Sequence, residues 1–392
     1  LAYGDATRLL RHADDALGPS LTHEERSELL LSLGRAQLRG GHRDDAAESF
    51  ERAADLARQS GRADHLALAA LGLGAGPSGF EIVPFDHRQV ELLEDALAAL
   101  PDGDSSLRAQ LLARLSVAKT FMTPPRERRD LAEQAGRLAR RMEDPATLAY
   151  ALGTLCDAIA GPADVERRLG LASEMVALSS RSHDREAELL ARRLRIVAHL
   201  ERGDVASFDA ELEAYARVAD RLRLPLYRWY VPLWRATRAM MRGDFAAAEA
   251  LHHEAITLGR QAASYNAELL AEVATADRLF LSGRLEDADR AQRELFAHRP
   301  EINSLPGLGP VVGCFAALRG DLEGARRLYG ARAAGSLDDI EVDAEWLPTI
   351  AITGVVAALL DDPDVAAGAY ERLEPHAERF VVDGIAAAFF GS

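Results

Sequence analysis

Three consecutive residues, His252, His253 and Glu254, have the side chains of a metal site, since histidine and glutamate both bind zinc. Helical zinc motifs place their two histidines four residues apart, so that both point to the same side of the helix. Adjacent histidines point to different sides. His252 also falls at the position that Phe50 fills in a related part of the chain. We therefore expect this pair to be packed or solvated, without a metal ion.

Other patterns that could support chemistry also have simpler interpretations. The stretch Gly74–Gly79 has the Gly-x-Gly-x-x-Gly spacing of a dinucleotide site, but such a site requires a preceding strand and a following helix. Here a helix precedes the glycines and Phe80–Pro84 follows them, which indicates an inter-helix loop. The acidic pairs that begin at Asp14, Asp338 and Asp361 are expected at turns and helix starts, where they favour the helix dipole. The sequence thus predicts no catalytic residue and no cofactor, and the chain is expected not to be an enzyme.

An aromatic stretch, Tyr227–Trp234, stands out because only 6% of the residues are aromatic and two of the three tryptophans lie in it. Pro232 should kink this helix or mark its late start. One interpretation is an aromatic core that restores packing around the proline. The other is a ligand or partner site on the inner face of a helical array.

For the second interpretation, the inner face would draw its side chains from three successive helical units. The wall would be mostly apolar with few polar groups, which suits a small molecule or a peptide. The residues placed there are Arg193 and Val197, then Tyr230, Leu233, Thr237 and Met240, then Val273, Asp277 and Phe280.

The elements that would position these residues follow from a repeated turn. A glycine-led turn recurs at Gly41, Gly203, Gly243, Gly283 and Gly320, and the last four glycines are 40, 40 and 37 residues apart. A fixed period of this length is typical of a solenoid of helical hairpins. Further breaks near residues 82, 123, 161 and 361 bring the expected number of hairpins to about nine, in an all-α right-handed superhelix. No strand is predicted.

The first full unit shows how one hairpin would pack. Leu30, Leu33 and Gly34 lie on its first helix, and Ala46, Phe50 and Ala53 follow at helical spacing after the turn. The small residues allow a close approach of the two helices, and Phe50 fills the space beside them. This arrangement resembles the tetratricopeptide pattern. The stretch Thr22–Glu25 is a capping box that should begin the first helix.

Helix starts elsewhere are marked by proline. Thr123-Pro124, Asp144-Pro145, Gly161-Pro162 and Asp362-Pro363 read as N-cap and first-turn pairs. Gly384–Phe390 is expected to begin an apolar helix at the end of the chain.

Charge and composition limit the partners. The net charge of -16 disfavours direct binding to nucleic acid, whose affinity for proteins comes largely from phosphate contacts. No apolar run reaches the ~18 residues needed to cross a bilayer. The two cysteines, Cys156 and Cys314, do not indicate a disulfide framework. We expect a cytoplasmic protein, and residues 1–392 to be a single repeat domain cut from a larger multidomain protein.

The chain as a whole resembles the tetratricopeptide (MalT-like) sensor region of actinobacterial LuxR-type large ATP-binding transcriptional regulators. The segments that carry the resemblance are Ala70–Gly76, Leu100–Ser105, Pro225–Trp234 and Asp343–Leu347. It implies a sensor or scaffold that binds an inducer, a peptide or a protein partner, and that acts on its own ATPase and output domains. A stand-alone protein–protein interaction module is the alternative, and part of an enzyme is a third.

Overall fold

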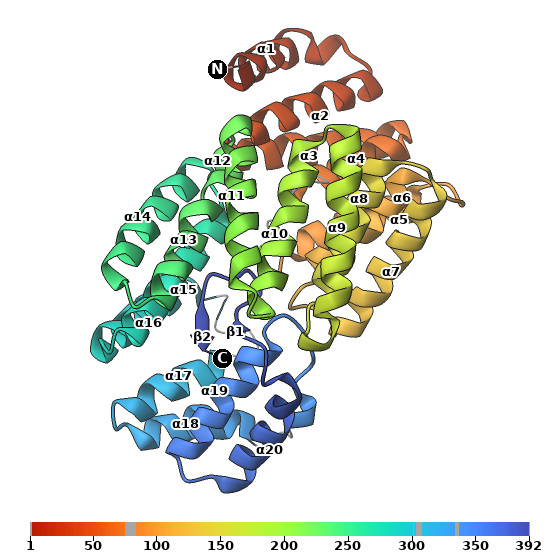
Figure 1. Cartoon of the computed structure of the whole chain (residues 1–392). Coiled ribbons are helices and arrows are strands. Elements are labelled where there is room, and N and C mark those ends of the chain that lie inside the picture. The colour runs from red at the N-terminus through yellow and green to blue at the C-terminus, as the bar shows by residue number, and fades with distance from the viewer. Residues whose placement is uncertain (1, 75–83, 301, 303–307, 334–336, 392) are drawn as a thin grey trace. The chain divides into compact units, whose positions relative to one another are not determined.

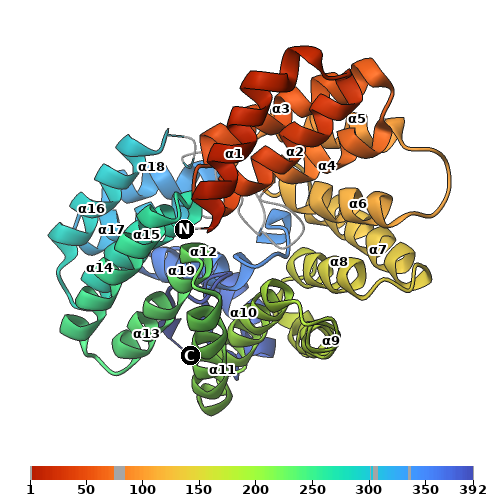
Figure 2. The ribbon, with the colours of Figure 1, turned by 90° about the horizontal axis from the view of Figure 1, so that it is seen from above.

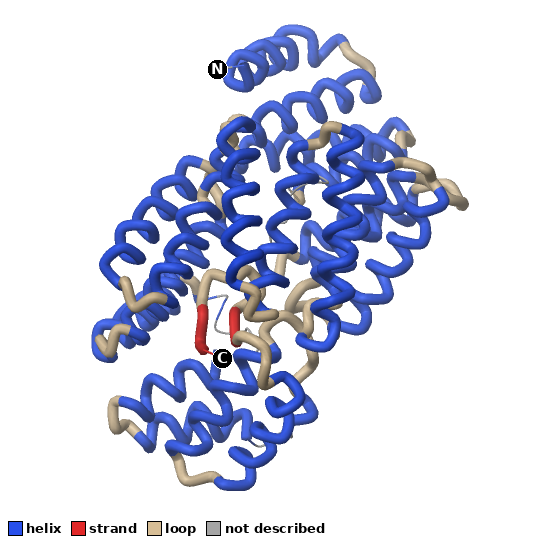
Figure 3. Tube along the Cα trace, in the orientation of Figure 1, coloured by secondary structure: helices blue, strands red, loops and turns tan. Residues whose placement is uncertain are grey.

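The computed structural model describes residues 2–74, 84–300, 302, 308–333 and 337–391. Almost every regular element in this part of the chain is a helix (Figures 1 and 3). By their internal contacts the residues form two compact units. The first unit comprises Leu1–Ala158, Glu174–Leu190 and Gln261–Tyr265, and the second comprises Ile159–Ser173, Ala191–Arg260 and Asn266–Ser392.

The first unit is a succession of helices that can be followed in Figure 2. Each helix packs on the next one and often on the next but one, as α2 does on α3 and α4, and α6 on α7 and α8. Two further helices, α9 (Val165–Ser182) and α10 (Arg185–Glu201), contribute residues to both units. The helices of the first unit are α1 (Ala2–Leu17), α2 (His23–Arg39), α3 (Arg43–Ser60), α4 (Ala63–Leu73), α5 (His87–Ala99), α6 (Ser106–Ala118), α7 (Pro125–Arg141) and α8 (Pro145–Ala158).

The second unit continues the pattern, with α17 packed on α18 and α19, and α19 on α20. Its helices are α11 (Val205–Leu222), α12 (Pro225–Arg228), α13 (Tyr230–Met241), α14 (Phe245–Gln261), α15 (Tyr265–Leu281), α16 (Leu285–His298), α17 (Leu308–Leu318), α18 (Leu322–Ala333), α19 (Trp346–Leu359) and α20 (Pro363–Leu373). Two short strands, β1 (Val381–Val382) and β2 (Phe389–Gly391), pair antiparallel near the end of the chain.

The five glycines of the repeated turn share one backbone geometry, which explains why glycine recurs there. Each has a φ between 71° and 85°, in the left-handed region that favours glycine. The next residue donates its N–H to a carbonyl five residues earlier, as Asp204 does to His199 at 2.9 Å and Asp244 to Ala239 at 2.9 Å. This is the Schellman arrangement that ends a helix.

In three of these turns the residue after the glycine also begins the following helix. The carboxylate of Asp204 accepts the N–H of Ser207 at 3.0 Å, and Asp244 accepts that of Ala247 at 3.0 Å. Asp321 does the same for Gly324 at 2.8 Å. A Gly-Asp pair therefore ends one helix and caps the next, which keeps the connection short.

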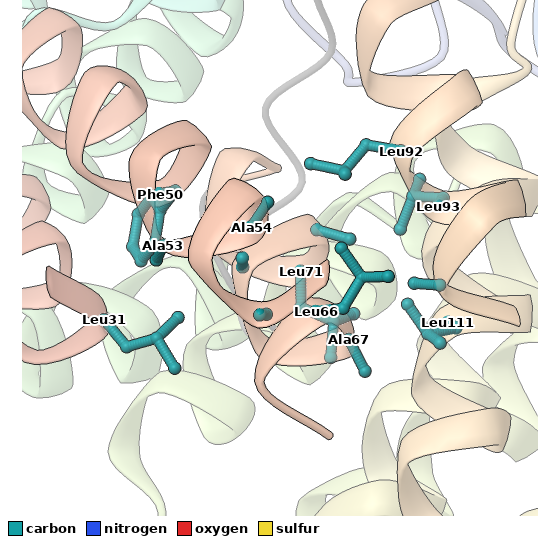
Figure 4. Close-up of a cluster of buried hydrophobic side chains, with 14 of the residues drawn as sticks. Leu31, Phe50, Ala53, Ala54, Leu66, Ala67, Leu71, Leu92, Leu93 and Leu111 are labelled. Atoms are coloured by element: carbon teal, nitrogen blue, oxygen red, sulfur yellow. The ribbon is translucent and has the colours of Figure 1, made fainter. Parts of the chain in front are cut away.

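The core of the first unit is built around Phe50, whose side chain is 1% exposed (Figure 4). A Cβ atom added at Gly34 in α2 would lie 2.8 Å from the ring, and one added at Gly72 in α4 would lie 2.4 Å from it. The ring thus fits between two glycines on neighbouring helices. The predicted packing of Phe50 beside Gly34 is confirmed, and Gly72 supplies the other side.

Several predicted helix starts are confirmed. Thr22 and Glu25 form the capping box at the start of α2, and Asp144 and Asp362 accept backbone N–H groups at the starts of α8 and α20. Two details differ. Pro124, and not Thr123, is the N-cap of α7. Asp14 lies inside α1, near its end, where its carboxylate pairs with Arg26 and Arg52.

The predicted helix at Gly384–Phe390 is wrong, and so is the expectation of no strand. Ala386 has a φ of 60°, and the N–H of Ala388 bonds to the Asp383 carboxylate at 2.9 Å. The left-handed backbone at Ala386 and the hydrogen bond to Asp383 form a tight loop between β1 and β2. The three consecutive alanines of this stretch suit a helix, but their backbone groups bond to the aspartate and to side chains of other helices.

Candidate functional site

The aromatic stretch is buried in the second unit. Trp229 and Trp234 are both 0% exposed. Trp229 stacks on Tyr230 with ring centroids 3.8 Å apart, and Tyr230 stacks on Trp234 at 5.1 Å. Tyr215 of α11 meets Trp234 edge to face at 5.0 Å. Pro232 is the third residue of α13, which confirms the late helix start. The stretch therefore forms a core between α11 and α13.

The residues predicted for the inner face do not all come together. Arg193 bonds to the hydroxyl of Tyr230 at 3.1 Å and lies over its ring, and Leu233 and Val197 are buried. Met240 belongs to a separate small core with α14, and Phe280 packs on Phe315 of α17 with centroids 5.0 Å apart. Val273 is half-buried. Thr237 and Asp277 lie beside a segment that the prediction did not include.

That segment is Val381–Gly391, here called the C-terminal segment. The indole N–H of Trp234 donates to the carbonyl of Ile385 at 2.8 Å. The hydroxyl of Thr237 lies 2.9 Å from the carbonyl oxygen of Ala386 and 3.1 Å from that of Ala387. Two side chains one turn apart on α13 thus contact three successive carbonyls of the tight loop between β1 and β2.

The start of α19 holds the same segment from another side. The carboxylate of Glu345, which is the N-cap residue of α19, accepts the N–H of Gly384 at 2.9 Å. A Cβ atom added at Gly384 would lie 2.8 Å from the Cβ of Ala344, so only glycine fits this close to the residues that precede α19. Ala386, Ala387 and Ala388 are at most 1% exposed. We call Trp234, Thr237, Asp277 and Glu345 the receiving face.

Sequence reasoning placed Thr237 and Asp277 on a binding face but omitted Trp234 and Glu345. Trp234 and Thr237 are three residues apart in one helix and so share a side of it, a signal that was available. Glu345 carried no comparable signal, because its role depends on a contact with Gly384, 39 residues later.

Three carboxyl groups interact at the C-terminal segment, those of the buried Asp277 and Asp383 and of the half-buried Glu345. Burial and the charge of Asp383 raise the pKa of Asp277 to about 8. Burial likewise raises the pKa of Glu345, with contributions from the charges of Asp383, Asp343 and Asp277. Burial also raises the pKa of Asp383, although its hydrogen bond from Ala388 opposes the shift. The oxygen Oδ2 of Asp277 is buried without a hydrogen-bond partner. The site therefore favours protonated carboxyl groups.

This cluster predicts that the second unit is less stable in mild alkali. A carboxyl group whose pKa is raised on folding stabilises the fold fully below its unfolded pKa, near 4, and loses that contribution as the pH rises through the folded pKa. For Asp277 the loss should extend to about pH 8. We expect the melting temperature to fall between pH 6 and pH 8.5, and Asp277→Asn to flatten this slope. Calorimetric melting curves of both proteins check this, and parallel slopes would contradict it.

The candidate metal cluster does not form. His252 is 1% exposed and His253 is exposed, so the two rings lie on different sides of α14, as predicted. Burial and the charge of Arg278 lower the pKa of His252 to about 4, which keeps its ring neutral. Gly74 is the C-cap of α4, and the rest of Gly74–Gly79 lies outside the described residues. Cys156 and Cys314 are both buried and are not joined in a disulfide. Among the residues described, no helix is both long and apolar enough to cross a membrane.

Comparisons with known proteins support the fold. No family model matches the chain, and no curated protein sequence matches it. A Rap protein complexed with Competence and Sporulation Factor superposes with a TM-score of 0.60 at 14% identity, over 91% of this chain and 98% of that one. A human IFIT1 dimer with m7Gppp-AAAA has a TM-score of 0.47 at 12% identity, over 90% of each chain. The APC/C hetero-tetramer Cut9-Hcn1 has a TM-score of 0.31 at 13% identity, over 96% of this chain and 84% of that chain.

The likeness to the Rap protein, together with the order of the helices, confirms the predicted fold class. The chain is a tetratricopeptide-like array of helical hairpins, and the nine hairpins that were predicted agree roughly with the helices in the described residues.

Proposed function

We propose that this chain is a non-enzymatic module that binds a looped peptide or protein segment on the receiving face of its second unit. The observation that carries the proposal is the hydrogen bonding of Trp234, Thr237 and Glu345 to the main chain of the C-terminal segment. Trp234 and Thr237 lie on α13 and Glu345 is the N-cap of α19, so the three side chains are already oriented to hold the backbone of a tight loop.

The contacts also indicate which peptides would fit. Main-chain hydrogen bonds give affinity without requiring a particular side chain, and specificity comes from the space left for each residue. Here that space admits glycine at position 384 and alanine at positions 386, 387 and 388. The face would accept a short run of small residues. The Rap structure of similar fold holds a bound factor, which makes ligand binding by such an array a reasonable expectation here.

The sensor role follows from the resemblance of the sequence to regulator sensor regions. Pro225–Trp234, one of the segments that carry this resemblance, also supplies Trp234 to the receiving face. A ligand that binds one state of the array better than another would shift the population toward that state. We propose that such a shift is passed to ATPase and output domains of a larger regulator, which would be the intramolecular partners of this module.

A fluorescent peptide with the sequence of residues 381–391 tests binding in trans. The full chain with Gly384→Ala is the receptor, because the added methyl group clashes with Ala344 and weakens the resident segment. We expect saturable binding by fluorescence anisotropy, and weaker binding to the wild-type chain, whose own segment competes at high effective concentration.

The matched control is Gly384→Ala combined with Thr237→Val, which removes a hydroxyl group and keeps the shape of the side chain. Its affinity for the peptide should be several-fold lower. The proposal would fail if the Gly384→Ala chain showed no saturable binding, or if loss of the Thr237 hydroxyl left the affinity unchanged.

A further inference from the structure

The C-terminal segment, here the resident segment, brings an acidic side chain to a receiving face that is itself acidic. Asp383 brings a carboxyl group to a place where Asp277 is already buried and Glu345 half-buried. The ion pairs of the described residues include none with these three groups. The nearest arginine in sequence, Arg278, pairs instead with Glu249 at 3.1 Å. The charged groups that act on one another in the cluster are Asp277 from α15, Asp343 and Glu345 just before α19, and Asp383 itself.

Like charges in a poorly solvated place repel strongly, and burial adds a desolvation cost to each ionised group. The segment gains main-chain hydrogen bonds from α13 and α19, but it pays an electrostatic penalty at Asp383. A different segment with the same small residues could keep the hydrogen bonds from α13 and α19 and remove the penalty, although it would lose the acceptor that Asp383 provides for the N–H of Ala388.

We infer that the receiving face selects a loop-forming segment with a basic residue in the place of Asp383, and that such a partner displaces the chain's own C-terminal segment. This inference rests on the proposed function and adds the chemical class of the partner, a basic peptide rich in small residues. An ammonium group in that place would lie near the carboxylates of Asp277 and Glu345, and it would give Oδ2 of Asp277 the hydrogen-bond donor that it lacks. The chain's net charge of -16 would also draw a basic peptide toward it.

The resident segment then acts as an internal competitor. Its attachment to the chain gives it a high effective concentration, which excludes weak ligands. A partner with a basic residue in the place of Asp383 would bind the receiving face more tightly than the resident segment does, because its charge attracts the carboxyl groups there. The face is therefore selective even though most of its contacts are to main-chain atoms.

Four synthetic peptides of residues 381–391 test the inference on the full Gly384→Ala chain. They carry aspartate, asparagine, lysine or 2,4-diaminobutyrate at position 383. Diaminobutyrate has nearly the length of aspartate, so it reverses the charge with little change in size. At pH 8 we expect the diaminobutyrate peptide to bind at least tenfold more tightly than the aspartate peptide, with asparagine between them.

The pH dependence supplies a second readout that a difference in shape would not produce. Protonation of the carboxyl groups between pH 8 and pH 5 should strengthen binding of the aspartate peptide and weaken binding of the diaminobutyrate peptide. The control is the Gly384→Ala chain with Asp277→Asn added. On this control the preference for the diaminobutyrate peptide over the aspartate peptide should fall several-fold. This comparison also accounts for the loop hydrogen bond to Ala388, because diaminobutyrate lacks that acceptor on both chains.

Displacement of the resident segment is measured on the wild-type chain by hydrogen exchange. Addition of the diaminobutyrate peptide should speed exchange of the amides of residues 381–391, and the aspartate peptide should do so less. Saturable binding of all four peptides with equal affinity would overturn the inference and leave the proposed function standing. Absence of binding by every peptide would overturn both.

Discussion

Replacement of Phe50 by alanine is expected to lower the free energy of unfolding by about 3–5 kcal/mol. The ring is 1% exposed and fits between Gly34 and Gly72, so its removal leaves a cavity that glycine backbones on two helices cannot fill. Urea denaturation followed by circular dichroism measures the loss.

A second substitution tests whether the close fit of the Phe50 ring against Gly72 accounts for the stability that Phe50 contributes. Gly72→Ala alone places a methyl group 2.4 Å from the ring and should cost about 1–3 kcal/mol through overpacking. Combined with Phe50→Ala, the same methyl group enters the vacated space. The double variant should therefore lose less stability than the sum of the two single variants. Strict additivity would show that the two residues do not share this space.

Replacement of Trp234 by alanine is expected to have a similar effect on the second unit, about 3–5 kcal/mol, because the buried indole packs on Tyr215 and Tyr230. It should also release the C-terminal segment, since the indole N–H holds the carbonyl of Ile385. Calorimetry measures the first effect, and hydrogen exchange of residues 381–391 measures the second.

Trp234→Phe separates packing from hydrogen bonding. The phenyl ring keeps most of the aromatic contacts and removes the N–H, so the carbonyl of Ile385 loses its donor at a cost of about 1–3 kcal/mol. We expect faster exchange in the C-terminal segment with a smaller fall in melting temperature than for alanine. Exchange as slow as in the wild-type chain would show that the indole N–H does not hold the segment.

The fold was predictable where its turns use glycine. At Gly203, Gly243, Gly283 and Gly320 the left-handed backbone geometry leaves a mark in the sequence, because glycine adopts it without strain. Elsewhere the same geometry is adopted by other residues, among them Phe121, Glu143, His183 and Asp361. Asp184 follows His183 and both closes one helix and caps the next, as the aspartates of the Gly-Asp turns do. The repeat therefore continues where its glycine signature is lost.

The site was predictable only in part, for a physical reason. Periodicity within α13 and α15 placed Thr237 and Asp277 on an inner face, because both lie on regular helices. The segment opposite them has a helical composition but is held as a tight loop by bonds from Trp234, Thr237 and Glu345. Trp234 and Thr237 are about 150 positions from the residues of the loop that they contact, and no local sequence pattern encodes such a contact.

The Gly-Asp turn has a consequence for the history of the array. Its glycine completes the end of one helix and its aspartate completes the beginning of the next, so all of its hydrogen bonds are made within a few residues. A stretch cut from Gly203 to Arg242, one turn to the next, would carry a matching end at each side. Its duplication or deletion would leave every helix terminus capped. Such turns are natural points for the recombination by which an array changes its length, and an engineer who wishes to shorten or extend this one should cut there.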